Sequence, residues 1–281
     1  MVDTYPSELI DNIKKNRNIF FVGAGISMEL GLPSWSKLIE ELIELLSKQS
    51  WSEQSKIDEY RELLKKDNTF LLLVEDLKTE LGNQYYDFMD AKFGKPDIGS
   101  SQTMMTILEL KPSIVITSNY DRIIENTYTK LHGYAPPTFT YRQSREIANN
   151  FWKEKFFVLK AHGDAFEDVK GIILSQRDYR KTLFREFGYK SILQSIFSTK
   201  SVFFVGTSMT DPEFNLLLDY IHESYSGGGP THYLLIEEEK ALPTYQRRFL
   251  EDYRIQVLTY KNHSGKHDEV NQYLTDLKKL I

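Results

Sequence analysis

The sequence predicts an α/β protein with a doubly wound parallel sheet of about six strands, and three observations support this prediction. Short β-rich segments alternate along the chain with stretches of helical character. Several of these segments are continuous apolar runs, which is typical of strands that helices cover on both faces. The 281 residues, of which 41% are hydrophobic and 27% charged, can bury a full core, and this composition excludes a disordered or collagen-like chain.

The predicted strands are spread along the whole chain, and the first and fourth contain the runs Ile-Phe-Phe-Val-Gly and Val-Phe-Phe-Val-Gly. Between the strands, apolar residues recur every three or four positions, as on one face of a helix. Asp211 followed by Pro212 is typical of a helix start. The predicted strands are Asn18 to Gly23, Ser113 to Thr117, Phe156 to Ala161, Ser201 to Gly206, His232 to Ile236 and Ile255 to Thr259. The clearest helical patterns are Trp35, Leu38, Ile39, Leu42 and Leu46, and then Phe214, Leu217, Leu218 and Ile221.

Two connections are longer than ordinary crossovers, which take few residues outside their helix. Residues 50–112 separate the first two predicted strands, and residues 165–200 separate the third from the fourth. Both stretches are rich in Leu, Phe, Tyr, Lys and Glu. We expect residues 1–281 to form a single domain in which these stretches are helical insertions that build a small lid subdomain; for most of their residues, structural padding is the simpler interpretation.

The composition also limits the chemistry. The chain has no cysteine, so it forms neither a disulfide nor a thiolate metal site, and six histidines give only weak metal options, so we expect no metal. A net charge of −5 makes nucleic acid a poor partner. The apolar run from Ile19 to Met28 is far shorter than the about 20 residues of a membrane span, and no cleavage pattern follows it. We therefore expect a cytoplasmic protein without a membrane partner.

The first candidate site loop is Gly23-Ala24-Gly25-Ile26-Ser27, directly after the first predicted strand. Ligands of open α/β sheets bind at the carboxyl ends of the strands, and glycine there lets backbone N–H groups approach a pyrophosphate. A tight strand-to-helix turn explains the same glycines equally well. The third glycine of the dehydrogenase fingerprint is replaced by Met28, and no second strand ends in an acidic residue about 20 positions further on. A hydride-transfer enzyme is therefore disfavoured.

Three further polar loops follow later strands. Thr117-Ser118-Asn119-Tyr120-Asp121 contains Asn119, which also suits a helix cap. His162, in Lys160-Ala161-His162-Gly163-Asp164, is either a general base or a structural hydrogen-bonding group. Because the carboxyl ends of parallel strands meet at one edge of a sheet, we expect the four loops to share one site. The residues expected there are Gly25, Ser27, Asn119, Asp121, His162 and, from the loop Gly206-Thr207-Ser208, Ser208.

The motifs G-A-G-I-S, T-S-N-Y-D, H-G-D and G-T-S-M-T-D-P-E-F, in this order over roughly residues 18–240, resemble those of the sirtuins. They are more closely similar to the SIR2-like NAD hydrolases of bacterial anti-phage defence systems such as Thoeris. The resemblance implies a Rossmann-like NAD-binding domain with a small helical subdomain and NAD as the substrate. In such a site Asn119 and Asp121 would face the nicotinamide ribose, and His162 would be the catalytic base. The pyrophosphate side of NAD would contact Gly23, Ala24, Gly25 and Ser27, and the adenosine side Gly206, Thr207 and Ser208.

The chain departs from the sirtuin pattern at several points. Sirtuin deacylases hold a structural zinc on four cysteines, so the absence of cysteine here predicts no zinc ribbon and makes deacylation less favoured. The sirtuin stretch G-I-P-D-F-R reads Gly31 to Ser36, in which Trp35 covers the nicotinamide or begins a helix core. The glutamine of the sirtuin Q-N-I-D is replaced by Ser118. Glu237, after the fifth predicted strand, either accepts hydrogen bonds from the adenosine ribose or opens a solvated charge run.

The resemblance implies that the protein cleaves the N-glycosidic bond of NAD, giving nicotinamide and ADP-ribose or a cyclic form, as an antiviral effector that depletes NAD. Two alternatives stay open. One is an NAD-dependent protein deacylase of sirtuin type, and the other is a non-catalytic module that binds NAD or ADP-ribose. Because a freely running NAD hydrolase would deplete its own cell, we expect a homo-oligomer, or control by a separately encoded activator or ATPase.

Overall fold

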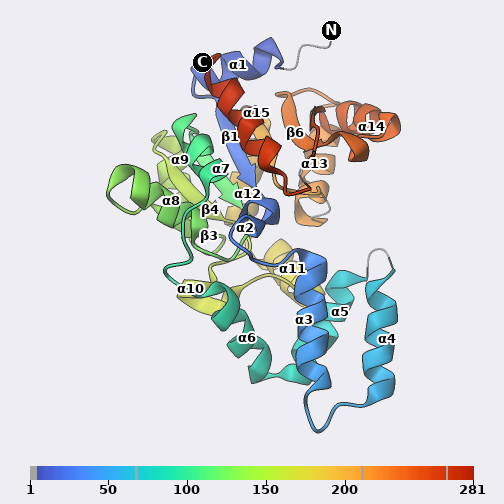
Figure 1. The fold of residues 1–281 in the computed structure, drawn as a ribbon. Helices are drawn as coiled ribbons and strands as arrows, with labels where there is room; N and C mark the ends of the chain where they lie inside the picture. The colour runs from blue at the N-terminus through green and yellow to red at the C-terminus, as the bar shows by residue number, and fades with distance from the viewer. Residues whose placement is uncertain (1–4, 67–68, 210–211, 264) are drawn as a thin grey trace.

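The computed structural model describes residues 5–66, 69–209, 212–263 and 265–281. These residues form a seven-stranded sheet in the order β3-β4-β2-β1-β5-β6-β7, in which every neighbouring pair is parallel. Helices pack on both faces of the sheet (Figure 1). The predicted doubly wound parallel α/β fold is therefore confirmed.

The six predicted strands are present, and the sheet contains one more strand that was not predicted. This strand, β3 (Thr138–Thr140), lies at the edge of the sheet beside β4, and its side chains are only half-buried. Three residues are too few to show an alternating pattern in the sequence. The others are β1 (Asn18–Val22), β2 (Ile114–Thr117), β4 (Phe157–Lys160), β5 (Ser201–Val205), β6 (His232–Glu237) and β7 (Ile255–Tyr260).

The unbroken apolar run of β1 follows from burial on both sides. Ile19 and Phe21 belong to the core on one face of the sheet, and Phe20 and Val22 belong to the core on the other. Alternate side chains of a strand point to opposite faces, so a strand covered on both faces needs apolar residues at every position. The first face carries α9 (Ser144–Trp152), α12 (Phe187–Thr199), α13 (Pro212–Ser224) and α14 (Pro243–Tyr253), and the second carries α1 (Ser7–Lys14), α7 (Gln102–Glu109), α8 (Ile123–His132) and α15 (Asp268–Lys278).

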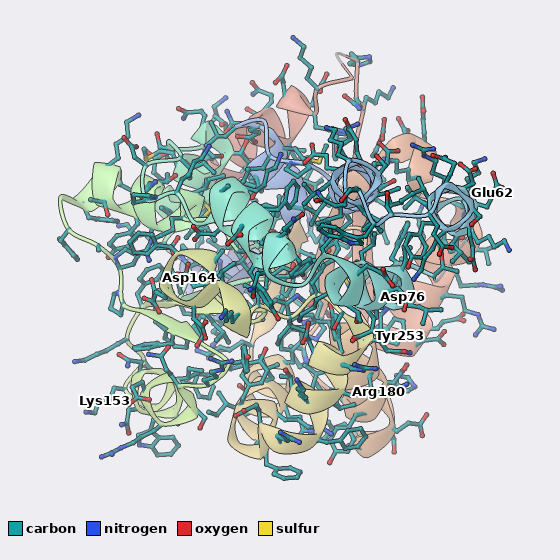
Figure 2. All side chains as sticks on the ribbon, turned by 90° about the horizontal axis from the view of Figure 1, so that it is seen from below. Glu62, Asp76, Lys153, Asp164, Arg180 and Tyr253 are labelled. Atoms are coloured by element: carbon teal, nitrogen blue, oxygen red, sulfur yellow. The ribbon has the colours of Figure 1, made fainter. Side chains whose placement is uncertain are left out.

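Four helices form a separate group with its own core, at the end of the sheet where β1 leads into α2 (Ala24–Met28) (Figure 1). We call this group the helical subdomain; it consists of α3 (Trp35–Ser47), α4 (Gln54–Leu64), α5 (Phe70–Leu81) and α6 (Asn83–Phe93). Figure 2 looks at the molecule from this side and shows Glu62 and Asp76 on the subdomain. The predicted helix from Trp35 is present, but its apolar face packs within the subdomain and not on the sheet.

The two long connections divide between the subdomain and the sheet. In residues 50–112, α4 to α6 belong to the subdomain, whereas α7 packs on the sheet through Met104 and Ile107. In residues 165–200, α12 packs on the sheet, while Ile172 and Leu174 reach the subdomain core. This second connection also contains α10 (Ala165–Asp168), η1 (Val169–Gly171) and α11 (Gln176–Arg185).

Two details complete the fold. α13 begins at Pro212, as predicted, while Asp211, the expected helix cap, lies outside the described residues. None of the helices in the described ranges is long and apolar enough to cross a membrane.

Candidate functional site

The loops after β1 and β5 interlock at the carboxyl edge of the sheet. The N–H of Gly23 donates to the Val205 carbonyl and the N–H of Gly25 to the Gly206 carbonyl, each over 2.9 Å. A Cβ atom at Gly23 would lie 2.5 Å from the carbonyl oxygen of Gly206, and Gly206 has a φ of +69°. Glycine is therefore required for these two loops to approach, whether or not a ligand binds. The tight-turn interpretation of the first motif is confirmed, and its role in binding a ligand stays a prediction.

The position of these loops is the one where α/β sheets bind ligands. β2 and β5 lie on opposite sides of β1 in the sheet. The strands that follow β1 in the sequence are thus added first on one side of it and then on the other. Such a switch in strand order opens a crevice at the carboxyl ends of the strands. The first and fourth sequence motifs, around Gly25 and Gly206, therefore meet at this crevice.

Asn119, Ser27 and Asp121 form one buried chain of hydrogen bonds beside the loop after β1. Asn119 Nδ2 donates to Ser27 Oγ over 2.8 Å and to the Gly23 carbonyl over 3.0 Å. Ser27 Oγ donates to Asp121 Oδ2 over 2.7 Å, and Asp121 Oδ1 accepts the N–H of Ile123 at the start of α8. Asn119 does not cap that helix. Both amide protons of Asn119 are used within the protein, so Oδ1 is the atom that remains for a ligand, and it is an acceptor.

A pocket with about 350 Å³ of open space lies over this chain of hydrogen bonds. Asn119 and Asp121 are among its polar lining residues, and Trp35, Phe93 and Tyr120 are its aromatic ones. The ring of Tyr120 lies edge-on to Trp35 at 6.4 Å and to Phe93 at 5.5 Å between centroids. The remaining lining residues are Ala24, Ser27, Leu32, Pro33, Leu38 and Ser118. Since α3 and α6 supply Trp35 and Phe93, the pocket lies between the sheet edge and the helical subdomain.

Trp35 begins a helix core, as one of its two interpretations predicted, and its contact with nicotinamide stays a prediction. It is the first residue of α3 and packs against the subdomain core, and it also lines the pocket. Tyr120 and Phe93 were not predicted as site residues. Tyr120 lies between Asn119 and Asp121 in the second motif, and this place was a usable signal. Phe93 ends α6, and nothing in its local sequence connects it with a loop that follows β2.

His162 lies apart from this pocket. Its imidazole is fully buried and contacts the rings of Tyr179 in α11 and Phe214 in α13, at 5.2 Å and 6.2 Å between centroids. Its carbonyl accepts the N–H of Ile173 over 2.9 Å. The structure thus brings Asn119, Asp121 and Ser27 together, and it does not bring the imidazole to the pocket that they line.

The remaining predicted contacts lie along the edge of the sheet. Ser208 is exposed, and Thr207 Oγ1 accepts the N–H of Met209 over 3.3 Å. Glu237 ends β6 and its carboxylate is bound by Lys240 and Asn262, each over 3.0 Å. The hydrogen bonds from Lys240 and then from Asn262 hold the pKa of Glu237 below its ordinary value. The described part of the chain contains no group of three His, Cys, Asp or Glu side chains arranged to hold a metal ion.

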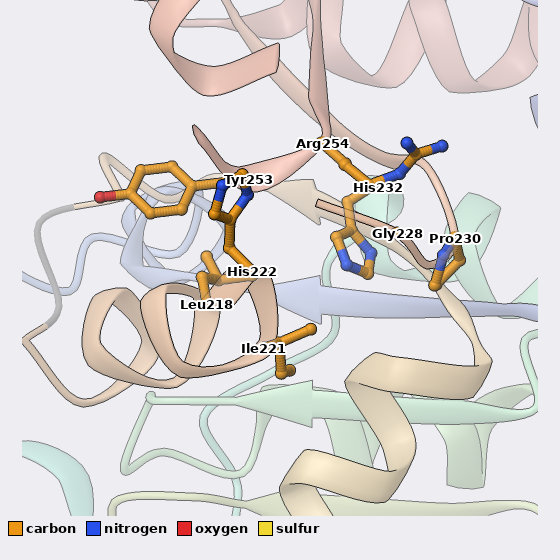
Figure 3. Close-up of a pocket in the computed structure, with 8 residues that line it drawn as sticks. All are labelled: Leu218, Ile221, His222, Gly228, Pro230, His232, Tyr253 and Arg254. Atoms are coloured by element: carbon orange, nitrogen blue, oxygen red, sulfur yellow. The ribbon is translucent and has the colours of Figure 1, made fainter. Parts of the chain in front are cut away.

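A second, small pocket lies at the opposite, amino-terminal edge of the sheet, where β6 and β7 begin (Figure 3). It contains none of the predicted site residues. His232 Nδ1 accepts the N–H of Val202 over 3.1 Å. Burial, and then the charge of Arg254, lower the pKa of His232 to about 4. The other lining residues are Leu218, Ile221, His222, Gly228, Pro230 and Tyr253.

The parallel sheet, the interlocked glycine loops at its switch point and the adjoining polar pocket define a Rossmann-like α/β domain. The model of a family described as "SIR2-like domain" matches residues 113–258, slightly more than half of the chain. The chain therefore belongs to the SIR2-like domain family, and the resemblance carried by the four motifs is confirmed.

Relatives with curated descriptions are similar over most of this chain. An NAD(+) hydrolase ThsA of Bacillus cereus (strain MSX-D12) is 26% identical over 86% of this chain and 48% of its own length. Defense-associated sirtuin 2 of Bacillus subtilis is 25% identical over 77% of this chain and 20% of its own length. An NAD(+) hydrolase ThsA of Enterococcus faecium is 24% identical over 80% of this chain and 44% of its own length. The chain thus spans about half or less of the length of these relatives.

Solved structures of Sir2 homologues are also similar. A Sir2 homologue mutant in complex with ADP-ribose has a TM-score of 0.48 and 13% identity, with 99% of both chains covered. A Sir2 homologue in complex with NAD has a TM-score of 0.42 and 12% identity, with 98% of this chain and 95% of the other covered.

Proposed function

We propose that this protein cleaves the bond between nicotinamide and ribose in NAD and releases nicotinamide together with ADP-ribose or a cyclic form of it. One observation carries the proposal: the buried chain of Asn119, Ser27 and Asp121 lines a pocket that Trp35, Phe93 and Tyr120 also line. Two of the relatives are named as NAD(+) hydrolases and a third as a defence-associated sirtuin, which supports NAD as the substrate.

The chemistry of the bond fits these side chains. Nicotinamide leaves as a neutral molecule from a cationic pyridinium, so positive charge moves to ribose C1′ in the transition state. The protein therefore needs to fix the sugar and to stabilise a cation, and it need not protonate the leaving group. The Asp121 carboxylate is 4% exposed and supplies negative charge in a site with little water. Asn119 Oδ1 accepts a hydrogen bond from a ribose hydroxyl or from the attacking water.

The rest of NAD follows the edge of the sheet in this proposal. Trp35 and Tyr120 cover the nicotinamide ring, and the pyrophosphate lies along the glycine loop from Gly23 to Ser27. The adenosine extends over Gly206, Thr207 and Ser208. For Glu237 to accept the ribose hydroxyls, its carboxylate exchanges one of its two present partners, Lys240 or Asn262, for the ligand.

His162 is the proposed base that takes the proton from the attacking water or from a ribose hydroxyl. In the conformation described here, Tyr179 and Phe214 cover its imidazole. The assignment therefore requires one of these rings to move aside when NAD binds. This makes the role of His162 separable, by experiment, from that of Asn119.

Two substitutions test these roles. Asn119→Ala and His162→Ala are each expected to reduce nicotinamide release by at least about 10²-fold, the usual contribution of a positioned acid–base or polar group. Release is measured by chromatography of NAD and its products, and folding by circular dichroism. Asn126→Ala and His132→Ala, which lie on α8 away from the pocket, serve as matched controls with full activity.

The outcomes separate the two assignments. Full activity of Asn119→Ala would reject the proposed site. Loss of activity in Asn119→Ala together with full activity in His162→Ala would keep the site and reject the base. The chromatogram also identifies the product, because linear and cyclic ADP-ribose elute separately.

We further propose that the protein acts in the cytoplasm as an anti-phage effector that depletes NAD, and that assembly into a homo-oligomer or a separately encoded activator or ATPase controls it. Large apolar side chains on α13 and α14 support an interaction with another chain, because about half of each is exposed; they are Leu216, Tyr220, Tyr245 and Leu250. Analytical ultracentrifugation with parallel NAD assays tests this. A monomer that is fully active at cellular NAD concentrations would overturn it.

A further inference from the structure

Lys160, the last residue of β4, is a fully buried lysine directly beneath the loop that carries Asn119 and Asp121. Its side chain is 0% exposed. Its Nζ donates to the carbonyl of Tyr120 over 3.2 Å and to the carbonyl of Asp121 over 2.5 Å. Lys160 thus holds two consecutive carbonyl groups of the loop, and residues of the same loop line the candidate pocket, which Lys160 does not line.

Two buried carboxylates balance the charge of this lysine. Asp164 Oδ2 lies 3.3 Å from Lys160 Nζ, and Glu125 Oε1 lies 3.4 Å from it. Arg122 Nη1 also lies 3.3 Å from Asp164 Oδ2. Two cations and two carboxylates therefore occupy a space between β4, α8 and the start of α10.

An apolar residue would be the simpler occupant of this position. The neighbours of Lys160 in β4, Val158 and Leu159, are completely buried apolar residues. Removing a charge from water is costly, and a buried ion pair is often no more stabilising than apolar residues of the same volume. The feature that an apolar side chain could not supply is the pair of hydrogen bonds to the carbonyls of Tyr120 and Asp121.

These hydrogen bonds help to set the direction of the peptide groups on which the proposed site depends. The carbonyl of Tyr120 also accepts the N–H of Ala165 over 3.2 Å, so the contribution of Lys160 is greatest at the carbonyl of Asp121. With both carbonyls turned toward Lys160, the Asp121 carboxylate faces Ser27 Oγ and the N–H of Ile123. Ser27 in turn accepts from the Asn119 amide. A rotation of the peptide between Asp121 and Arg122, whose carbonyl Lys160 Nζ holds, would displace the carboxylate and, through Ser27, the Asn119 amide.

We propose that Lys160 is a positioning residue for NAD cleavage: it fixes the loop of residues 119–121 so that Asn119 Oδ1 and the Asp121 carboxylate face the pocket. This inference rests on the proposed function. Lys160 does not line the pocket and touches no substrate. Its loss leaves the NAD contacts along the glycine loop in place and misplaces the groups that act in the transition state.

The test uses Lys160→Met in combination with Glu125→Gln. Lys160→Met alone leaves two buried carboxylates with one cation fewer, and this variant can fail to fold for that reason. The double variant Lys160→Met/Glu125→Gln removes one cation and one carboxylate together. The control is Glu125→Gln alone, which keeps both hydrogen bonds from Lys160 to the loop.

We expect the double variant to unfold within a few degrees of Glu125→Gln and to have a kcat about 10²-fold lower, because a displacement of about 1 Å costs about that factor. Its KM for NAD should stay within about threefold of the control, since an interaction made only in the transition state affects kcat. A merely structural role predicts a lower melting temperature with unchanged kcat of the folded fraction, and this result would overturn the inference.

Hydrogen exchange in the absence of NAD provides a second readout. The N–H of Ile123 is bound to Asp121 Oδ1, so it should exchange faster in the double variant than in Glu125→Gln. If the wild-type protein does not cleave NAD, the proposed function fails, and exchange still tests whether Lys160 orders the loop. Wild-type kcat together with unchanged exchange in the double variant would refute the role of Lys160 and leave the proposed function intact.

Discussion

The close backbone contact between the loops of the first and fourth motifs is the main reason why these positions must be glycine. The Gly23 position faces the carbonyl oxygen of Gly206 and the backbone of Thr207, and neither can move without disturbing β5. Glycine loops are usually explained by the approach of a ligand. Here the approach of one loop to the other already excludes every larger side chain, so these glycines are needed for the crevice to form even without a ligand.

Gly23→Ala is therefore expected to destabilise the protein and to abolish NAD cleavage. Its Cβ would lie 2.5 Å from the Gly206 carbonyl oxygen and 2.8 Å from Thr207 Cα, so one loop must shift. Overpacking of this kind costs about 1–3 kcal/mol. Urea denaturation gives the change in the free energy of unfolding.

Gly188→Ala is the matched control for this substitution. A Cβ there meets Ser144 Oγ at 2.9 Å and Ser144 Cβ at 3.1 Å; the hydroxyl can rotate away, and the second contact needs a shift of only a few tenths of an ångström. Gly188 also lies in α12, where alanine is the better helix former. Equal losses of stability in the two variants would show that the contact between the β1 and β5 loops is not specifically constrained.

Among the helices, α5 and α11 are joined by a charged contact that ties the helical subdomain to the chain after β4. Ser175 and Asp178 form a capping box at the start of α11. Asp178 Oδ2 also accepts from Lys78 Nζ of α5 over 2.8 Å, and both side chains are mostly buried. Burial alone would raise the pKa of Asp178, but the hydrogen bond and charge of Lys78 and the bonds from Ser175 lower it. The contact is therefore present above the unfolded pKa of the carboxyl and is lost as pH falls through the lower folded value.

Asp178→Asn is expected to lower the free energy of unfolding by about 1–3 kcal/mol, because Lys78 keeps its charge in a mostly buried position without its partner. Chemical denaturation at neutral pH measures the change. The matched control is Asp58→Asn, which removes an exposed pair with Arg61 and should cost less than about 0.5 kcal/mol. If both substitutions had the same small effect, the α5–α11 contact would not hold the subdomain.

Over the entire fold, stability depends on pH through groups that folding removes from water. His232 lies at the amino-terminal edge of the sheet, far from the proposed catalytic loops, and accepts a hydrogen bond as a neutral ring. Its pKa falls from 6.5 to about 4 on folding, because burial and the charge of Arg254 disfavour the cation. Below pH 6.5 the unfolded chain binds a proton at this position that the folded chain does not bind.

The free energy of unfolding should therefore decrease as pH falls from about 6.5 to about 4, by up to about 3 kcal/mol from this group, and show no further change from it below pH 4. Thermal unfolding across this pH range measures the effect. His232→Asn keeps an acceptor for the Val202 N–H and does not titrate, so its stability should vary less with pH. Identical pH dependence of the two proteins would contradict the prediction.

Much of the fold and part of the site could be predicted because they depend on local patterns. A strand buried on both faces must be apolar at every position, and parallel strands bring the loops at their carboxyl ends to one edge; these two rules place Gly25, Ser27, Asn119 and Asp121 correctly near one another. They miss β3, because three half-buried residues are too few to show a strand pattern. The pattern of α3 predicted the helix itself, but not whether its apolar face packs on the sheet or on other helices.

The amino-acid order alone thus determined six of the strands, the parallel α/β fold class, the motifs and the family to which the chain belongs. Only the tertiary structure decided which side chains complete the pocket. It also decided that Lys160 holds the loop of residues 119–121 and that Tyr179 and Phe214 cover His162. The physical reason is distance along the chain. The hydrogen bond from Asn119 to Ser27 joins residues 92 positions apart, and that from Lys160 to Asp121 joins residues 39 positions apart. The periodic pattern of a short stretch of sequence cannot indicate contacts between residues so far apart.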